Sequence, residues 1–148
     1  MKGRVHYVSP KGSAEAVAEA IARECKIVKE PLMPAYMPEG IALMFLGCEG
    51  TKMDKVTKEF ISSMDKKRVE NVALFGCNPK MSQAALDEMR SELTARGVNV
   101  LKQTFVCSGK GGLFSGGHAP NETDLENARK FAADCIKQVM GEIGRAHV

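Results

Sequence analysis

A hydroxyl-rich turn near the N-terminus is the strongest chemical feature of the sequence. It comprises Ser9, Lys11, Gly12, Ser13 and Ala14, between an apolar run and an amphipathic segment. Such a turn between a strand and a helix aims backbone N–H groups and the positive end of the helix dipole at one point. The two hydroxyls and the lysine add donors, so we predict that this turn binds a phosphate group. The alternative is an ordinary turn in which Ser13 only caps the helix.

Three cysteines form a second candidate group. Cys48, Cys77 and Cys107 each follow a successive apolar run. If these runs are adjacent strands, about 4.8 Å apart, all three thiols could surround one site. A redox or metal cluster is one interpretation, but small buried thiols at strand ends are common packing residues. We therefore expect packing or hydrogen-bond contacts beside a ligand, with no metal ligand and no catalytic nucleophile or base.

The elements that position these residues follow from the hydrophobic pattern. Strands are expected at residues 5–8, 27–28, 41–46, 72–75 and 98–106, and helices at residues 14–25, 53–64, 86–93 and 125–139. The run from Ile41 to Leu46 shows no polar alternation, which is typical of a parallel strand covered on both faces. The alternating elements predict an α/β fold: a doubly wound five-stranded parallel sheet of order 2-1-3-4-5, with helices on both faces.

Local signals add detail to this fold. Lys102 and Gln103 interrupt the last strand, which indicates a bulge or an exposed edge. Gly97 stands where a helix C-cap is expected, and Asn121 with Asp124 three residues later predicts an N-cap.

The site is expected beyond the carboxyl ends of the strands, where ligands bind in open doubly wound sheets. Besides the Ser9–Ala14 turn, this rule selects the segments that follow the three later strands. Their candidate ligand-binding residues are Gly47, Cys48, Glu49, Gly76, Cys77, Asn78, Pro79, Met81, Cys107 and Gly109.

Two segments carry a family resemblance. Tyr7 to Ile21 (YVSPKGSAEAVAEAI) resembles the phosphate loop of the flavodoxin family, and Cys107 to Phe131 is similar to the closing loop and helix of short flavodoxins. With the strand and helix order, the resemblance covers residues 3–140. It implies FMN as the cofactor, with its phosphate on Ser9, Lys11, Gly12 and Ser13 and its ring between the loops after the third and fourth strands. A β-branched residue at Gly12 is then expected to weaken phosphate binding by obstructing close backbone approach.

The chain also departs from the family pattern. Ala14 replaces a hydroxyl that the family's loop usually offers. The chain has no Trp, so Met53, Pro79, Met81 or Phe114 would have to cover the ring. Lysines at the strand-end loops (Lys11, Lys52, Lys80 and Lys110) replace the acidic rim typical of flavodoxins, which would suit an acidic partner or another anion. The alternative is that these lysines only solvate the loops.

Length, composition and charge limit the classes of protein that fit the sequence. A chain of 148 residues with 44% hydrophobic residues suits one domain, which we place at residues 1–140, with residues 141–148 as a frayed tail or a cloning remnant. Five cysteines without a C-x-x-C pair or an export signal indicate free thiols and a cytoplasmic protein. A net charge of +3 does not predict a nucleic-acid partner, and no apolar run could span a membrane.

Three other classes of protein with this architecture are excluded by the residues in the same loops. A receiver domain needs acidic residues where Val8-Ser9 and Gly47-Cys48 stand. A small phosphatase needs Arg six residues after its cysteine, and a nicotinamide fingerprint needs its glycines after the first strand.

The favoured prediction is an FMN-binding electron-transfer protein with a redox protein partner or a small-molecule acceptor. Two alternatives stay open: a small FMN-dependent NAD(P)H or quinone reductase, and a flavin-free interaction module. Whether the protein is an enzyme, and its oligomeric state, are left open by the sequence.

Overall fold

The structure is a computed structural model, which describes residues 1–78, 82–107 and 120–146, with side chains through Gly141. The strands are β1 (Gly3–Tyr7), β2 (Val28–Pro31), β3 (Ile41–Cys48), β4 (Val69–Cys77) and β5 (Asn99–Cys107). The helices are α1 (Ser13–Cys25), α2 (Lys55–Ser62), α3 (Gln83–Ala95) and α4 (Glu122–Ala146). The strands form a parallel sheet of order β2-β1-β3-β4-β5, which confirms the predicted α/β fold.

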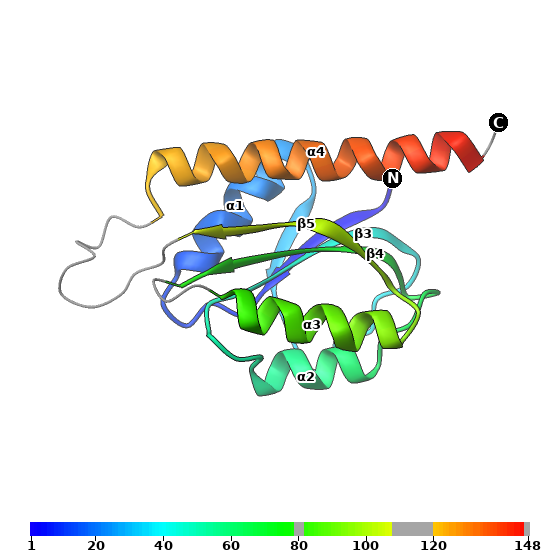
Figure 1. Cartoon of the computed structure of the whole chain (residues 1–148), viewed down its shortest axis with the longest axis horizontal. Coiled ribbons are helices and arrows are strands. Elements are labelled where there is room, and N and C mark those ends of the chain that lie inside the picture. Colours follow the sequence, from blue (N-terminus) through cyan, green and yellow to red (C-terminus); the bar gives the residue numbers. More distant parts are fainter. Residues whose placement is uncertain (79–81, 108–119, 147–148) are drawn as a thin grey trace.

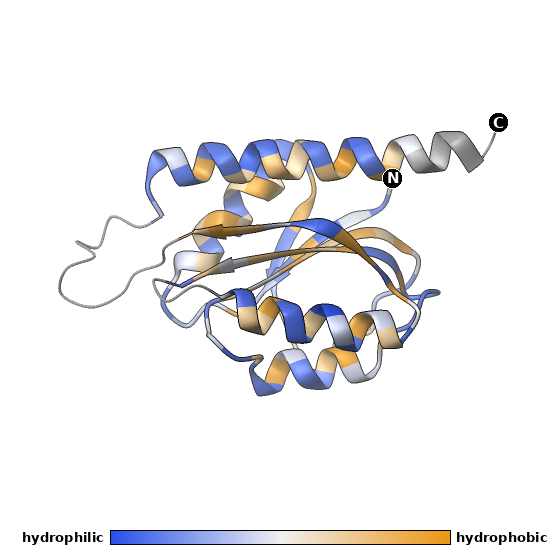
Figure 2. Ribbon diagram, viewed as in Figure 1, coloured by the Kyte–Doolittle hydropathy of each residue, from blue (hydrophilic) through white to orange (hydrophobic). Residues whose placement is uncertain are grey.

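Helices cover both faces of the sheet (Figure 1). Successive side chains of β3 point to opposite faces, as the pleat requires: Leu43 and Phe45 pack with α1 and α4, whereas Met44 and Leu46 pack with α2 and α3. All four of these side chains are fully buried. This two-sided burial explains why the run carries no polar alternation. Figure 2 shows the matching pattern on the helices, with apolar residues toward the sheet and polar residues outward.

The edge strand β5 is irregular where Lys102 and Gln103 interrupt it. Val72 pairs with Val100, but Leu74 pairs with Thr104, so β5 uses two more residues than β4 between these pairs. The expected edge position is confirmed, and the register shift shows that the pairing is irregular at these residues.

Predicted helix ends are also confirmed. Gly97 has a φ of 84°, and Gly97 and Val98 donate backbone hydrogen bonds to Thr94 and Leu93, which closes α3. Asn121 and Asp124 exchange side-chain to backbone hydrogen bonds of 2.8 and 3.0 Å ahead of α4.

Helix α4 runs to Ala146, so the backbone of residues 141–146 is helical. The division into a domain of residues 1–140 and a tail stays a prediction.

Candidate functional site

Three donors of the turn after β1 converge on one carboxylate. The Glu49 carboxylate accepts hydrogen bonds from the Lys11 backbone N–H at 2.8 Å, from the Ala14 backbone N–H at 2.9 Å, and from the Ser9 hydroxyl. Glu49 is only 7% exposed. The turn, called here the anion-binding loop (Ser9–Ala14), is therefore shaped to hold a negatively charged oxygen group at the N-terminus of α1.

Ser9 links this carboxylate to the helix. Its hydroxyl donates to Glu49 and accepts the backbone N–H of Glu15 at 2.9 Å. It thereby satisfies a donor of the first helical turn that has no partner within the helix. Gly12, not Ser13, holds the N-cap position, and it makes no side-chain cap. Ser13 is thus the first residue of α1, and the choice between an ordinary turn and a phosphate site stays a prediction.

Gly12 is required for its backbone conformation. Its φ is 84°, in the left-handed region that other residues rarely adopt. A Cβ at Gly12 would meet no described atom within 4 Å. A side chain at Gly12 would therefore be strained by the backbone conformation, and the expected obstruction of a bound phosphate stays a prediction.

Two side chains of the anion-binding loop are buried. Ala14 is fully buried in the core between the sheet and helices α1 and α4. The site uses the Ala14 backbone N–H, so the hydroxyl missing at this position is not needed to hold the carboxylate. Ser13 is also buried, at 1% exposed.

The ends of the later strands are tied to the same residue. The Asn78 side-chain amide donates to the backbone carbonyl of Glu49, and the Asn78 backbone N–H donates to the Cys107 carbonyl at 3.1 Å. Glu49 thus connects the loop after β1 to the ends of β4 and β5. The expectation that the loop after β1 and the ends of the later strands lie together is thus met at Glu49 and Asn78.

Gly47 and Gly76 are small because neighbouring side chains occupy their space. A Cβ on Gly47 would lie 2.2 Å from atoms of the Phe75 ring, which packs across the adjacent strand. A Cβ on Gly76 would lie 2.5 Å from the Cβ of Ser82, at the start of α3. These glycines serve the packing of the strand ends.

The three cysteines do not form one group. Cys77 and Cys107 are register partners, and their Sγ atoms lie 2.9 Å apart among the residues packed with α1 and α4. Cys48 pairs in register with Gly76 and packs on the opposite face of the sheet. The expectation that all three thiols surround one site is wrong, because a shift of one residue along a strand reverses the face.

Two of the three thiols, those of Cys48 and Cys77, have raised pKa values. Burial raises the pKa of Cys48 to about 12. The hydrogen bond with Cys107, together with burial, raises the pKa of Cys77. A thiol in this state is a poor nucleophile and a poor metal ligand. The described residues contain no cluster of three His, Cys, Asp or Glu side chains able to hold a metal ion.

Several predicted residues lie outside the described part of the chain. They are the candidate ligand residues Pro79, Met81 and Gly109, the candidate ring cover Phe114, and the rim lysines Lys80 and Lys110. The other two rim lysines, Lys11 and Lys52, are exposed, and Met53 is buried in the core beside α2 and α3. The candidate ring cover Met53 is therefore a core residue on that face of the sheet.

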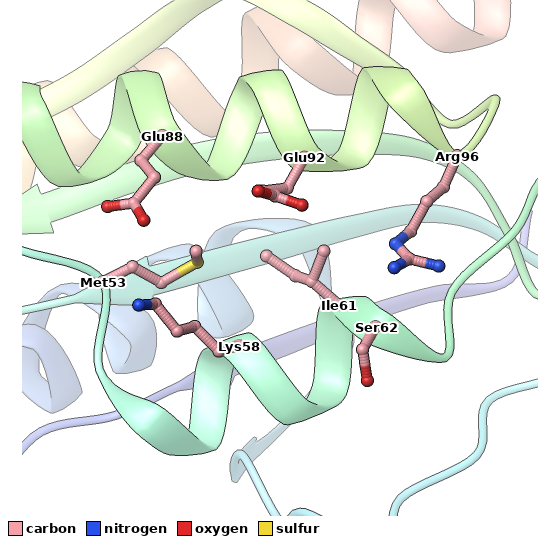
Figure 3. A pocket seen from close by; sticks show the side chains of 7 residues that line it. All are labelled: Met53, Lys58, Ile61, Ser62, Glu88, Glu92 and Arg96. Atoms are coloured by element: carbon pink, nitrogen blue, oxygen red, sulfur yellow. The ribbon is translucent and has the colours of Figure 1, made fainter.

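A separate hollow lies between α2 and α3. Figure 3 shows the residues that line it: Lys58, Ile61 and Ser62 of α2, Glu88 and Glu92 of α3, Arg96 at the end of α3, and Met53. No residue of the anion-binding loop lines it, so it is distinct from the strand-end site.

The role of Glu49 was missed by the sequence reasoning, which included it only as one of many candidate ligand contacts. The signal that could have revealed it is an acid placed directly after a buried strand that neighbours β1. In the described ranges, no helix is both long and apolar enough to cross a membrane.

Comparison with known proteins supports the fold. No protein-family model and no curated protein sequence matches the chain. Among solved structures, a flavodoxin from the domain Archaea is 17% identical, with a TM-score of 0.69, covering 95% of this chain and 99% of its own. A short-chain flavodoxin associated with a non-canonical PDU bacterial microcompartment has the same identity and TM-score, covering 94% and 99%. Oxidised flavodoxin 2 from Bacillus cereus is 14% identical, with a TM-score of 0.68, covering 93% and 99%.

Proposed function

We propose that this protein, which has a flavodoxin-like fold, is an FMN-binding electron carrier. The observation that carries the proposal is the convergence of the Lys11 and Ala14 backbone N–H groups and the Ser9 hydroxyl on one carboxylate. A phosphate group offers the same kind of acceptor oxygens and more negative charge, so the donor set fits it.

The residues of this chain would bind and orient the cofactor. Ser9, Lys11, Gly12, Ser13 and Ala14 would hold the phosphate, and the strand-end segments at Gly47–Glu49, Gly76–Met81 and Cys107–Gly109 would border the ring. When bound, FMN supplies the redox chemistry, because a flavin accepts and releases electrons. The chain supplies position and electrostatics, with the loop N–H groups and the helix dipole stabilising negative charge.

The exposed side chains of Lys11 and Lys52 give this end of the molecule positive charge. They would favour a redox partner with an acidic surface, or a small anionic acceptor. If the acceptor or donor is a pyridine nucleotide, the protein is instead a small reductase. Rapid oxidation of NAD(P)H by the FMN-loaded protein would identify a reductase. If NAD(P)H is not oxidised, the electron-carrier proposal stands.

A second candidate is a flavin-free interaction module, and one observation favours it. The Glu49 carboxylate itself accepts hydrogen bonds from three donors of the anion-binding loop. In that case the loop is a structural joint between β1 and β3 and not a binding site.

Flavin retention separates the two candidates. Purified protein is mixed with excess FMN, passed through a desalting column and measured by visible absorption, and a fluorescence titration gives the dissociation constant. The proposal expects a retained flavin band and saturable quenching of FMN fluorescence. A colourless protein with no saturable binding, in both the wild type and a Glu49→Gln variant, would reject the carrier and favour the interaction module.

A further inference from the structure

We propose that Glu49 is a resident anion that competes with phosphate for the anion-binding loop and so sets the preference of the site between phosphorylated and unphosphorylated ligands. The identity of the ligand as FMN rests on the proposed function, but the competition itself concerns any phosphate group. The basis is that the carboxylate takes the Ser9 hydroxyl and both the Lys11 and Ala14 N–H groups.

Occupation of the loop by the two anions is mutually exclusive. Each backbone N–H makes one good hydrogen bond, so the N–H groups of Lys11 and Ala14 cannot serve Glu49 and a phosphate together. A phosphate group in the loop and the buried Glu49 carboxylate would also repel each other, because both are negatively charged. Glu49 must therefore withdraw its carboxylate before phosphate enters.

The withdrawal needs only the side chain to move. The Glu49 backbone carbonyl is held by the Asn78 side-chain amide, and Glu49 directly follows Cys48, the last residue of β3. The contacts that would break belong to the carboxylate, whereas those that anchor the backbone stay. The loop thus has two alternative occupants on one scaffold.

A consequence for ligand choice follows. A phosphorylated ligand must displace hydrogen bonds to a charged group, each of which is a strong interaction in proteins. Riboflavin, which lacks the phosphate, has no need to displace Glu49. The ratio of FMN affinity to riboflavin affinity is therefore lower in this chain than it would be with an uncharged residue 49.

The experiment compares Glu49→Gln with a matched control, Glu15→Gln. Both variants remove one negative charge, and Glu15 lies in the first turn of the same helix. The Glu15 carboxylate takes no hydrogen bond from the loop; its described contact is with the Tyr7 hydroxyl, at 3.5 Å. Dissociation constants are measured for inorganic phosphate, FMN and riboflavin on all three proteins.

The expected result is that Glu49→Gln binds inorganic phosphate and FMN about tenfold or more tightly than the wild type, while riboflavin affinity changes by less than about threefold. Glu15→Gln should stay near the wild type for all three. Equal phosphate affinity in Glu49→Gln and the wild type would overturn the proposal, as would an equal gain for FMN and riboflavin.

The outcomes also separate this proposal from the proposed function. A gain in phosphate affinity without FMN binding by any variant supports the competition and rejects the FMN carrier. Equal FMN affinity in the wild type and Glu49→Gln supports the carrier and rejects the competition.

A second variant is followed by NMR, because the dispersion of the amide signals reports whether the variant is folded while the titration proceeds. In Glu49→Ala, the amide NMR signals of Lys11 and Ala14 should shift at phosphate concentrations about tenfold below those that shift them in the wild type. Coincident titrations would overturn the competition.

Discussion

The Oε2 atom of Glu49 lies 2.9 Å from the backbone nitrogen of Ala14, the second residue of α1. The two residues are separated by 35 positions in the sequence, and the contact joins the end of β3 to the start of the helix that follows β1. The N-terminus of α1 is thus closed by a carboxylate that directly follows the neighbouring strand.

Removal of this carboxylate should destabilise the protein in the absence of ligand. In Glu49→Ala, the donors on Ser9, Lys11 and Ala14 lose their acceptor, and water replaces it only in part. We expect a loss of about 1–3 kcal/mol in the free energy of unfolding, measured by urea denaturation. Added phosphate should restore part of the loss, because an anion that binds only the folded state stabilises it. A variant as stable as the wild type in phosphate-free buffer would contradict this role.

Acid should destabilise the fold through His6. This residue is 2% exposed; its Nδ1 lies 3.2 Å from the Glu30 carbonyl, and its ring centroid lies 4.5 Å from that of Tyr36. Burial lowers the pKa of His6 below its ordinary value of 6.5. The unfolded chain therefore takes up a proton at higher pH than the folded chain does. As pH falls through 6.5 toward the folded pKa, the contribution of neutral His6 to stability is lost.

The measurement is the free energy of unfolding between pH 8 and pH 5. His6 alone should lower this free energy by about 1.4 kcal/mol per pH unit or less as the pH falls. His6→Gln should be less stable than the wild type at pH 8 but should show a shallower decline toward pH 5. Parallel curves for the two proteins would assign the decline to other groups.

A methyl group at Gly47 should be costly, and the same change at Gly141 should not. The Gly47 Cβ would overlap the fully buried Phe75 ring, so we expect Gly47→Ala to lose about 1–3 kcal/mol through overpacking. A Cβ on Gly141 in α4 would meet no described atom within 4 Å, and Gly141→Ala should gain up to about 1 kcal/mol from helix propensity. Urea denaturation measures both.

A double variant tests the cause of the Gly47 effect. Phe75→Leu removes the ring that the new methyl group meets, so Gly47→Ala should cost less in that background. Additive losses would show that the destabilisation has another origin.

Thiol reactivity should follow burial. Cys25 is half-buried with its pKa raised to about 11, whereas Cys48 and Cys135 are buried with pKa values raised to about 12. In the native protein at pH 8 we expect Cys25 to be alkylated by iodoacetamide before Cys48 and Cys135, because access and thiolate fraction both favour it. Mass spectrometry of the partly modified protein gives the order. Faster labelling of Cys48 would contradict its buried position.

The fold was predictable because its signals are local. The unbroken apolar run of β3 indicated burial on both faces, and Lys102 with Gln103 indicated the irregular edge of β5. The glycine, the hydroxyls and the position before a helix also predict that the turn after β1 binds a phosphate group, and this stays a prediction. Each of these signals depends on neighbouring residues in the sequence.

The details of the site were less predictable because they depend on register and on the contacts of side chains distant in sequence. Cys48 follows its strand as Cys77 does, yet it pairs with Gly76, and this offset of one residue places it on the other face. Glu49 reaches the anion-binding loop only because β3 lies beside β1. No periodicity in the sequence reports which side chain fills a site between two strands.

A final prediction separates the role of Gly12 in binding from its role in folding. Gly12 and Gly97 share a φ of 84°, but Gly12 lies in the anion-binding loop and Gly97 closes α3. An alanine at either position is strained, so we expect each variant to lose about 1–2 kcal/mol of stability by urea denaturation. Only Gly12→Ala should weaken binding of inorganic phosphate, because its strain shifts the Lys11 and Ala14 N–H groups on either side. Isothermal titration measures that affinity, in a Glu49→Gln background where the loop is open. If Gly97→Ala weakens phosphate binding as much as Gly12→Ala does, the effect comes from general destabilisation, and the loop around Gly12 loses its special role.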